Sequence, residues 1–351
     1  MNAYDIAKPL LFSLPAETAH AVGHGALGVA GHAPLDRALA RRYVVDDPRL
    51  RVDALGRSFP NPVGVAAGFD KNAEAVRGLA ALGFGHVEVG GVTAVPQSGN
   101  PRPRMFRLRA DDAVINRMGL NNDGVEVIGR RLRALEAPVP VGVNIAKSEH
   151  VAPADAPADY RATYEAVAAG GDFFVVNVSC PNSQGFEELQ NRESMEAILT
   201  ELQDAGAAPL LVKLSPDLPE PAVADALDLV TDLGLDGVVA TNTSTERPET
   251  LESPNRAETG GLSGRPIEAR ATEVTRFVAE RVDVPVIGVG GVATAEDAYR
   301  KIRAGASLVQ LYTAFVYRGP SIAREINRGL LDLLERDGFD SVAAAVGADL
   351  D

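Results

Sequence analysis

The sequence predicts an α/β protein, a (β/α)8 TIM barrel with a small N-terminal helical extension. Eight short runs rich in Val, Ile and Leu recur along the chain from residue 52 onward. A junction rich in Gly, Asn, Ser or Thr follows each run, and a helical pattern follows the junction. Uninterrupted apolar runs are typical of strands buried on both faces, as in parallel sheets. Eight such units over roughly 300 residues favour a closed barrel, with an open doubly wound sheet as the alternative.

The apolar runs define the predicted strands. We expect them at residues 63–67, 86–90, 141–146, 173–179, 210–215, 237–240, 286–289 and 308–312. Helical signatures lie between them. Apolar residues recur at i, i+3, i+4 and i+7 in Met195, Ile198, Leu199 and Leu202, and Thr294 with Asp297 resembles a capping box. The longer insertion at residues 93–122 is rich in proline, which predicts a structured loop over the mouth of the barrel.

Residues 1–45 differ from the rest, and we expect them to form a separate extension before a barrel of residues 46–351. Their low charge and apolar residues predict two short helices, the first ending near Leu14 and the second spanning about residues 16–29. His20 and His24 are spaced i, i+4, but without an evident third ligand a half-exposed helix face is favoured over a metal pair. We therefore expect the extension to pack on the barrel or to meet an apolar partner such as a membrane surface.

Composition excludes several classes of protein. The 351 residues contain 48 acidic and 34 basic side chains, a balance that argues against nucleic-acid binding. The single cysteine excludes an internal disulfide and any multi-cysteine metal site. Neither a signal peptide nor a membrane-spanning segment is indicated, so an intracellular location is expected. Scarce lysine and abundant Asp, Glu and Ala indicate adaptation to a high-salt cytosol.

The most informative stretch is residues 175–182, where an apolar run ends in amides, a hydroxyl and the only thiol, Cys180. Pro181 cannot donate to a sheet ladder, so the strand must end near Cys180 and turn outward. A lone cysteine is otherwise a small buried hydrophobic residue. The amides of Asn177 and Asn182 instead favour a site for a planar, polar ligand.

Polar residues also follow the other predicted strands, at the end of a barrel where active sites lie. They occur at residues 67–71, 90–93, 144, 213, 241–243, 290–291 and 312–313. The amides and hydroxyls suit a heteroaromatic ligand, and the lysines suit an anionic one. Gly290 and Gly291 could form a simple turn, but their place after the seventh strand is typical of phosphate binding in barrels. The lysines could equally be solvated surface groups.

Eight motifs together resemble the dihydroorotate dehydrogenase family, flavin enzymes of pyrimidine synthesis. They are AAGFDKN, GNPRPRMFRL, INRMGLNN, NVSCPN, VKLSPDL, ATNT, TGGLSGRP and GVGGV, and their order extends the resemblance over nearly the whole chain. The extension resembles class 2, the membrane-associated branch that reduces quinone. The resemblance implies a peripheral location on the cytoplasmic side of the cell membrane, with dihydroorotate, orotate and quinone as partners and no metal.

The resemblance also implies site residues. FMN contacts are expected at Ala67, Gly68, Gly91, Asn144, Asn177, Lys213, Thr241, Gly264, Gly291, Tyr312 and Thr313. Substrate contacts are expected at Lys71, Asn116, Arg117, Met118, Gly119, Leu120, Asn177, Asn182, Asn242 and Thr243. Cys180, Lys71 and Lys213 are the expected catalytic residues: Cys180 takes the substrate proton, Lys213 stabilises negative charge on the reduced flavin, and Lys71 holds the substrate.

Two positions depart from the class 2 pattern. Cys180 stands where class 2 enzymes usually carry serine and is typical of the soluble class 1 branch, and Gly91 stands where a hydroxyl residue is usual. The quinone acceptor is therefore inferred from the extension. The alternatives are a soluble class 1-like enzyme that uses fumarate or NAD, another FMN barrel with a different substrate, and a non-catalytic flavin-binding barrel. The sequence leaves the oligomeric state open.

Overall fold

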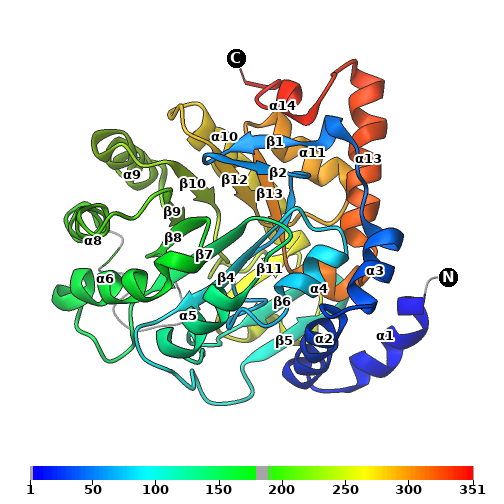
Figure 1. Cartoon of the computed structure of the whole chain (residues 1–351), viewed down its shortest axis with the longest axis horizontal. Coiled ribbons are helices and arrows are strands. Elements are labelled where there is room, and N and C mark those ends of the chain that lie inside the picture. Colours follow the sequence, from blue (N-terminus) through cyan, green and yellow to red (C-terminus); the bar gives the residue numbers. More distant parts are fainter. Residues whose placement is uncertain (1–2, 179–188, 190, 351) are drawn as a thin grey trace.

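Eight parallel strands form a closed barrel in the computed structural model, which describes residues 3–178, 189 and 191–350 (Figure 1). The barrel order is β10-β12-β13-β3-β4-β7-β8-β9. The strands are β3 (Val63–Val65), β4 (His86–Val92), β7 (Val141–Ala146), β8 (Phe173–Asn177), β9 (Leu210–Leu214), β10 (Gly237–Ala240), β12 (Val286–Val289) and β13 (Leu308–Leu311). All eight predicted runs form barrel strands, so the barrel is confirmed and the open sheet was the wrong alternative.

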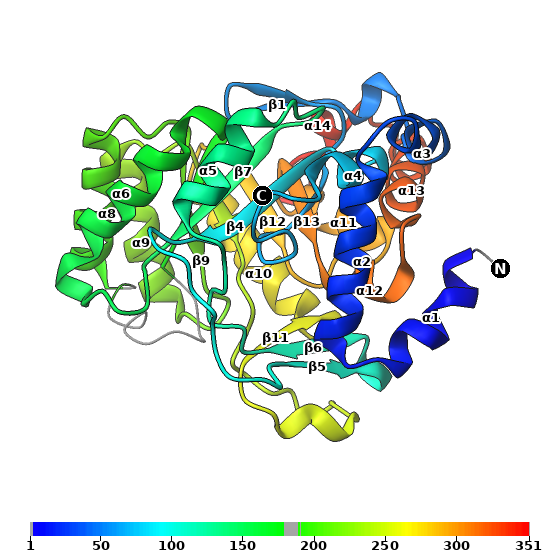
Figure 2. The ribbon, with the colours of Figure 1, turned by 60° about the horizontal axis from the view of Figure 1, so that its bottom comes forward.

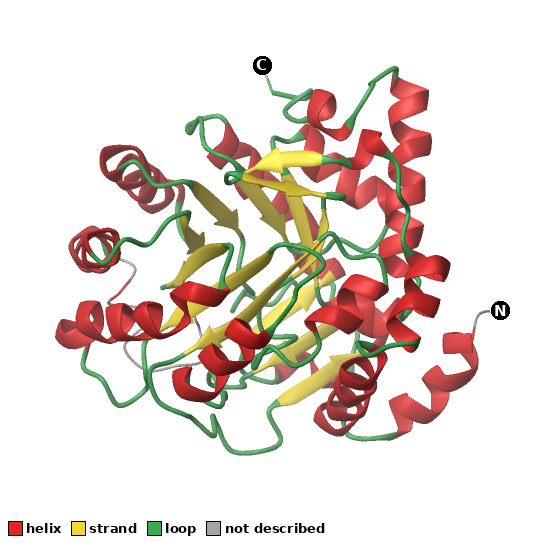
Figure 3. Cartoon of the chain, in the orientation of Figure 1, coloured by secondary structure: helices red, strands yellow, loops and turns green. Residues whose placement is uncertain are grey.

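Helices surround the barrel, as Figure 3 shows. They are α4 (Val76–Ala81), α5 (Val125–Ala134), α6 (Ala156–Val167), α8 (Arg192–Asp204), α9 (Glu220–Leu233), α10 (Glu268–Ala279), α11 (Ala295–Arg303), α12 (Thr313–Arg318), α13 (Ile322–Asp337) and α14 (Val342–Ala345). The predicted apolar face of α8, from Met195 to Leu202, is buried against the barrel. The predicted capping box is also present, because Thr294 accepts from the backbone N–H of Asp297 and Asp297 accepts from that of Thr294.

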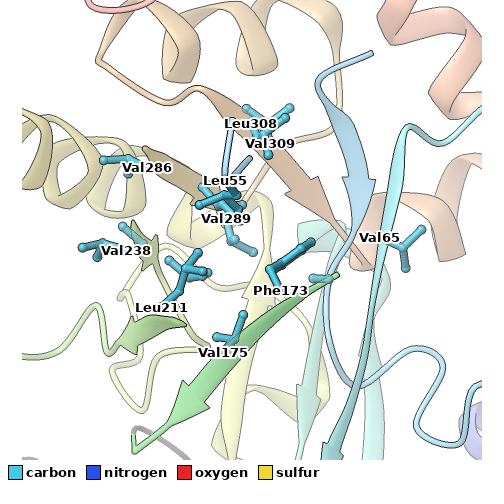
Figure 4. Packing of buried hydrophobic residues seen from close by; sticks show 14 of the residues in the cluster. Leu55, Val65, Phe173, Val175, Leu211, Val238, Val286, Val289, Leu308 and Val309 are labelled. Atoms are coloured by element: carbon cyan, nitrogen blue, oxygen red, sulfur yellow. The ribbon is translucent and has the colours of Figure 1, made fainter. Parts of the chain in front are cut away.

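Most of the buried core is apolar, and part of it is shown in Figure 4, where Phe173, Val175 and Leu211 come from the adjacent strands β8 and β9. An antiparallel hairpin of β1 (Val52–Ala54) and β2 (Arg57–Phe59), which the sequence patterns did not predict, lies against the strand starts. Its Phe59 ring contacts His86 and Phe173, the first residues of β4 and β8. The hairpin therefore closes the amino-terminal end of the barrel and leaves the carboxyl end for a site.

A second sheet lies at the carboxyl end. It consists of β5 (Met105–Leu108), β6 (Ala113–Asn116) and β11 (Gly261–Gly264), all antiparallel, and Figure 2 shows it beside α2. Its first two strands lie within residues 93–122, where a structured loop was predicted. The insertion is thus more regular than expected, because β11, which lies far along the chain, completes the sheet.

The extension contains three helices, α1 (Ala3–Ser13), α2 (Ala16–Ala30) and α3 (Leu35–Tyr43). The first two agree with the prediction, and α3 was missed because its many charges obscure a short apolar face. Leu39 and Tyr43 of that face pack on the main core. Among the residues that the structure describes, no helix is long and apolar enough to cross a membrane.

His86 supplies a first prediction, on acid stability. Its ring is fully buried beside Phe59, and neither ring nitrogen has a hydrogen-bond partner among the described residues. Burial lowers its pKa from 6.5 to about 3. Between pH 6.5 and pH 3 the His86 imidazole is therefore protonated in the unfolded chain but neutral in the folded chain. The free energy of unfolding is thus unaffected by this group above pH 6.5 and falls as the pH drops from 6.5 toward 3. At pH 5 the loss from this one group is about 2 kcal/mol.

His86→Leu should remove that component, because leucine has a similar volume and does not titrate. The measurement is the free energy of unfolding by denaturant at pH 7.5 and pH 5, and the difference between the two should shrink by about 2 kcal/mol. His150→Leu, at an exposed position, is the matched control and should leave the difference unchanged. An unchanged pH dependence in His86→Leu would contradict the assignment.

Candidate active site

A pocket opens at the carboxyl ends of the barrel strands, and most of the predicted site residues line it. Those residues are Ala67, Gly68, Lys71, Gly91, Asn116, Met118, Gly119, Leu120, Asn177, Lys213, Thr241, Asn242, Thr243, Gly264, Gly291, Tyr312 and Thr313. They come from three barrel strands (β4, β8 and β9), from the segments that follow four others (β3, β10, β12 and β13), and from the antiparallel sheet with the loop after β6. Closure of the barrel brings them together because parallel strands all end on the same side.

Two described residues of the predicted set, Asn144 and Arg117, are not part of this lining. Asn144 is fully buried one layer deeper, where its amide contacts Asn177. The Arg117 side chain pairs with Glu258 at 2.8 Å and lies over the Phe106 ring, so in this structure it is engaged beside the pocket. Cys180 and Asn182 lie outside the described residues.

A chain of amides crosses the pocket floor. Asn242 Nδ2 donates to Asn177 Oδ1 at 3.4 Å, and Asn177 Nδ2 donates to Asn144 Oδ1 at 3.1 Å. Each amide is thereby held in one orientation by the next. Such a row presents fixed donors and acceptors to a planar heteroaromatic ligand.

Glycines form one wall, and their backbone shape requires glycine. Gly264, Gly290 and Gly291 have positive φ angles of 101°, 116° and 74°. A Cβ on Gly291 would lie 2.3 Å from the Cβ of Glu268, and one on Gly290 would lie 2.7 Å from that of Ala271. Bare backbone at this position can approach a phosphate closely. Gly68, which follows β3, differs: a Cβ there would have no described atom within 4 Å, so open space faces this glycine. The wall and the amide floor fit a flavin mononucleotide.

Lys71 brings positive charge to the other side. Its Nζ donates to the carbonyl of Gly68 at 2.5 Å. Burial, and then the nearby Arg104 guanidinium, lowers the pKa of Lys71 to about 8. Arg104 is itself paired with Glu17 of α2 at 2.8 Å. The extension therefore reaches the charged edge of the pocket.

Two functional candidates were missed from the sequence, Glu88 in β4 and Gln310 in β13. Both are fully buried inside the barrel, where Glu88 Oε2 accepts from Gln310 Nε2 at 2.8 Å. Glu88 Oε1 lies 3.5 Å from Lys213 Nζ. A signal existed, because each is a polar residue with an apolar residue on either side in a predicted strand. Buried charges are rare unless they are paired.

A second, apolar pocket lies between the extension and the barrel. It is lined by α1 to α3, by Phe69 and by α12, and it shares Met105, Val114 and Tyr312 with the first pocket. Tyr312 is thus a common wall. The two pockets adjoin at the carboxyl end of the barrel.

His20 and His24 line this apolar pocket from α2. The helix face that was predicted to be half-exposed is therefore the face that borders the pocket. The ring of His20 stacks on Tyr312 with centroids 6.1 Å apart, and His24 Nε2 lies 3.2 Å from Asp70 Oδ1. Burial, and then the positive charge of Lys71, lowers the pKa of His20 to about 3, so its imidazole is neutral at physiological pH. Within the described ranges no three His, Cys, Asp or Glu side chains gather as metal ligands do.

The fold and the pockets define a class: (β/α)8 barrels whose ligand pocket lies at the carboxyl ends of the strands and is extended by an N-terminal helical unit. Comparison with known families agrees and is more specific. The family model described as dihydroorotate dehydrogenase matches residues 49–334. The chain belongs to the dihydroorotate dehydrogenase family.

Individual relatives are similar over the full length. A protein of Haloarcula marismortui named dihydroorotate dehydrogenase (quinone) is 74% identical over 350 residues, with 100% of both chains covered. One of Natronomonas pharaonis with the same name is 63% identical over 350 residues, again covering 100% of both. The crystal structure of the Eimeria tenella enzyme in complex with ferulenol superposes with a TM-score of 0.84 at 39% identity, covering 90% of this chain and 93% of that one. The haloarchaeal relatives agree with the predicted high-salt adaptation.

Proposed function

We propose that this chain oxidises dihydroorotate to orotate with FMN as cofactor and passes the electrons to a quinone, in the synthesis of pyrimidines. The observation that carries the proposal is the junction of two different pockets at Tyr312. The first, here called the polar pocket, contains amides, hydroxyls and lysines beside a glycine wall, and the other is almost wholly apolar and open toward the extension. A polar substrate and an apolar electron acceptor can therefore each reach one flavin bound between them. The relatives' names favour this reading over fumarate or NAD as acceptor.

Different residues of the first pocket would bind different parts of FMN. The backbone of Gly264 and Gly291 and the start of α12 at Thr313 would hold the FMN phosphate. The amides of Asn177 and Asn242 would orient the planar rings. When bound, FMN would supply the hydride acceptor for the substrate. Lys213, at the floor, would place a fixed positive charge where negative charge develops.

The substrate would lie over the flavin, within reach of Lys71, Asn116 and the loop at Met118 to Leu120. Lys71 would hold its carboxylate as a cation, with Asn116 and Asn242 orienting the ring. Cys180 would remove the proton from C5 while the hydride leaves C6. A free thiol has a pKa near 8.5, which lies close enough to neutrality for general-base catalysis.

The extension would form the quinone route and the contact with the membrane. We propose residues 1–45 as this unit, bound peripherally to the cytoplasmic face of the cell membrane. Ile6 and Leu10 of α1 are 71% and 72% exposed, and Val22 and Val29 of α2 are exposed as well. Exposed aliphatic side chains on helices beside an apolar pocket suit insertion into the lipid surface. A quinone could then enter the pocket directly from the lipid.

One anaerobic experiment tests the proposed reaction. Mixing the FMN-loaded protein with dihydroorotate should bleach the visible flavin absorbance, and adding a soluble quinone analogue should restore it. Fumarate and NAD serve as parallel acceptor arms. A flavin that dihydroorotate fails to bleach would refute the dehydrogenase assignment, whereas reoxidation by fumarate or NAD alone would refute the quinone assignment.

Gly23→Leu tests the route of the quinone. Gly23 lines the apolar pocket from α2, and a Cβ there would have no described atom within 4 Å, so leucine fills open pocket space. Crowding of this kind costs about 1–3 kcal/mol of binding, so the KM for quinone should rise roughly tenfold or more. Bleaching by dihydroorotate should proceed at the normal rate.

Gly25→Leu is the matched control. Gly25 lies in the same helix and is exposed, and its Cβ position is equally free of described neighbours. Both substitutions raise helix propensity by a similar amount, about 1 kcal/mol. Equal quinone kinetics in the two variants would show that the pocket is not the quinone route.

A further inference from the structure

Glu88 is a buried carboxylate at the centre of the barrel, directly beneath the polar pocket. It lies on β4 with 0% exposure. Its Oε1 accepts from Asn144 Nδ2 of β7 at 2.7 Å and lies 3.5 Å from Lys213 Nζ of β9. Its Oε2 accepts from Gln310 Nε2 of β13 at 2.8 Å. One carboxylate thus joins side chains from three other strands of the barrel.

Two partners of Glu88 connect it to the polar pocket. Lys213 itself lines the pocket, and Asn144 contacts Asn177, which also lines it. Glu88 lies behind both and touches no ligand that the pocket could hold. A carboxylate is costly to bury, and hydrogen bonds and an opposite charge offset that cost. We therefore expect Glu88 to act through the two side chains that it contacts, Lys213 and Asn144.

We infer that Glu88 is a positioning residue that fixes the Lys213 ammonium at the pocket floor and neutralises part of its charge, and thereby sets the reduction potential of the bound flavin. The inference rests on the proposed binding of FMN. Two-electron reduction of a flavin near neutral pH adds negative charge to its ring. The Lys213 ammonium at the pocket floor would favour that state, and the paired carboxylate would oppose it. The balance of the two charges sets how readily the flavin accepts electrons.

Glu88→Gln removes the negative charge with little change in shape. The new amide oxygen can accept from Asn144 as before. The new amide nitrogen faces Gln310, whose Oε1 is buried and has no hydrogen-bond partner within the described part of the chain. Rotation of the Gln310 amide would present this oxygen to the new donor. After this rotation Gln310 Nε2, in place of Gln310 Oε1, is the amide atom left without a partner among the described residues, so the number of unpaired buried polar atoms does not rise and the variant is expected to fold.

The flavin midpoint potential is the measurement, obtained by titration with dithionite and an indicator dye. In Glu88→Gln the ratio of reduced to oxidised flavin at fixed potential should rise about tenfold, which for a two-electron couple is a positive shift of about 30 mV. Gln310→Met is the packing control, since it disturbs the same network without altering charge, and it should shift the potential much less. An unchanged or more negative potential in Glu88→Gln would overturn the inference.

A charge cycle covers the case in which the single variant is unstable. Lys213→Gln alone should make the potential more negative, because Glu88 is then unopposed. The double variant Lys213→Gln with Glu88→Gln carries neither charge and should return toward the wild-type potential. A double variant with a potential as negative as that of Lys213→Gln would overturn the inference. Dithionite drives these titrations, so a failure of dihydroorotate to reduce the flavin would refute the proposed function and not this one.

Discussion

Cys180→Ala should slow flavin reduction by dihydroorotate by roughly a hundredfold or more, the usual contribution of a positioned base, while FMN and orotate still bind. Cys180 lies outside the described residues, so the expectation rests on its place in the chain. It follows Asn177, the last residue of β8, by three positions, and Asn177 lines the polar pocket. A methyl group cannot accept the C5 proton. The glycine wall and the amide floor, which would hold the ligands, are untouched by the change.

The pH dependence separates a base from a merely neighbouring thiol. Cys180→Ser should retain part of the activity, since serine occupies this position in class 2 enzymes, but it should require higher pH because a hydroxyl is the weaker acid. The measurement is the rate of anaerobic flavin bleaching across pH for wild type and both variants, with orotate affinity as the control for binding. Near-normal reduction in Cys180→Ala would show that the proton goes to another group.

Lys213→Ala should weaken FMN binding by about a hundredfold and also slow flavin reduction. Lys213 is 4% exposed, and its ammonium is paired with the fully buried Glu88. Removing one partner of a buried ion pair costs about 3–5 kcal/mol, because the other charge is left uncompensated. Part of that free energy would be lost from FMN binding, because the flavin ring would then face the Glu88 carboxylate without the intervening cation. Titration of the flavin-free protein with FMN, followed by flavin fluorescence, measures the affinity.

Lys147→Ala provides a matched control for loss of a buried lysine. Lys147 is 1% exposed at the end of β7, and its Nζ donates to the carbonyls of Ser148 and Val151. It is not among the described residues that line the polar pocket. Its replacement should lower stability without changing the affinity for FMN. Equal FMN affinity in Lys213→Ala and wild type would contradict the assigned role of Lys213.

Local patterns were sufficient to predict the barrel and most of the pocket lining. A strand buried on both faces must be apolar along its length, and a parallel strand must end where its polar junction begins. The position of each strand and of its carboxyl end can therefore be read from consecutive residues. The run from Leu210 to Leu214 and the lysine within it are readable in this way. Once the barrel order is known, the residues at the strand ends must meet.

Features that depend on distant partners could not be predicted from these patterns. The third strand of the upper sheet, β11, pairs with β6 across more than a hundred residues, as the register Gly261 with Asn116 illustrates. The helix α3 depends on the surface that the barrel offers to Leu39 and Tyr43. The pairing of Arg117 with Glu258 likewise joins residues 141 positions apart, and the ligand contact that the family resemblance implies for Arg117 stays a prediction.

Glu88 is the clearest example of a residue whose environment could not be predicted from the local sequence. In the sequence it is one acidic residue within a run of valines, and its charge alone gives no indication of a partner. Its hydrogen bond to Gln310 joins residues separated by 222 positions and exists only because the barrel closes between β13, β3 and β4. The free energy that keeps this carboxylate buried comes from donors on three other strands. Such a group acquires its environment, and with it any function, only when the chain has folded.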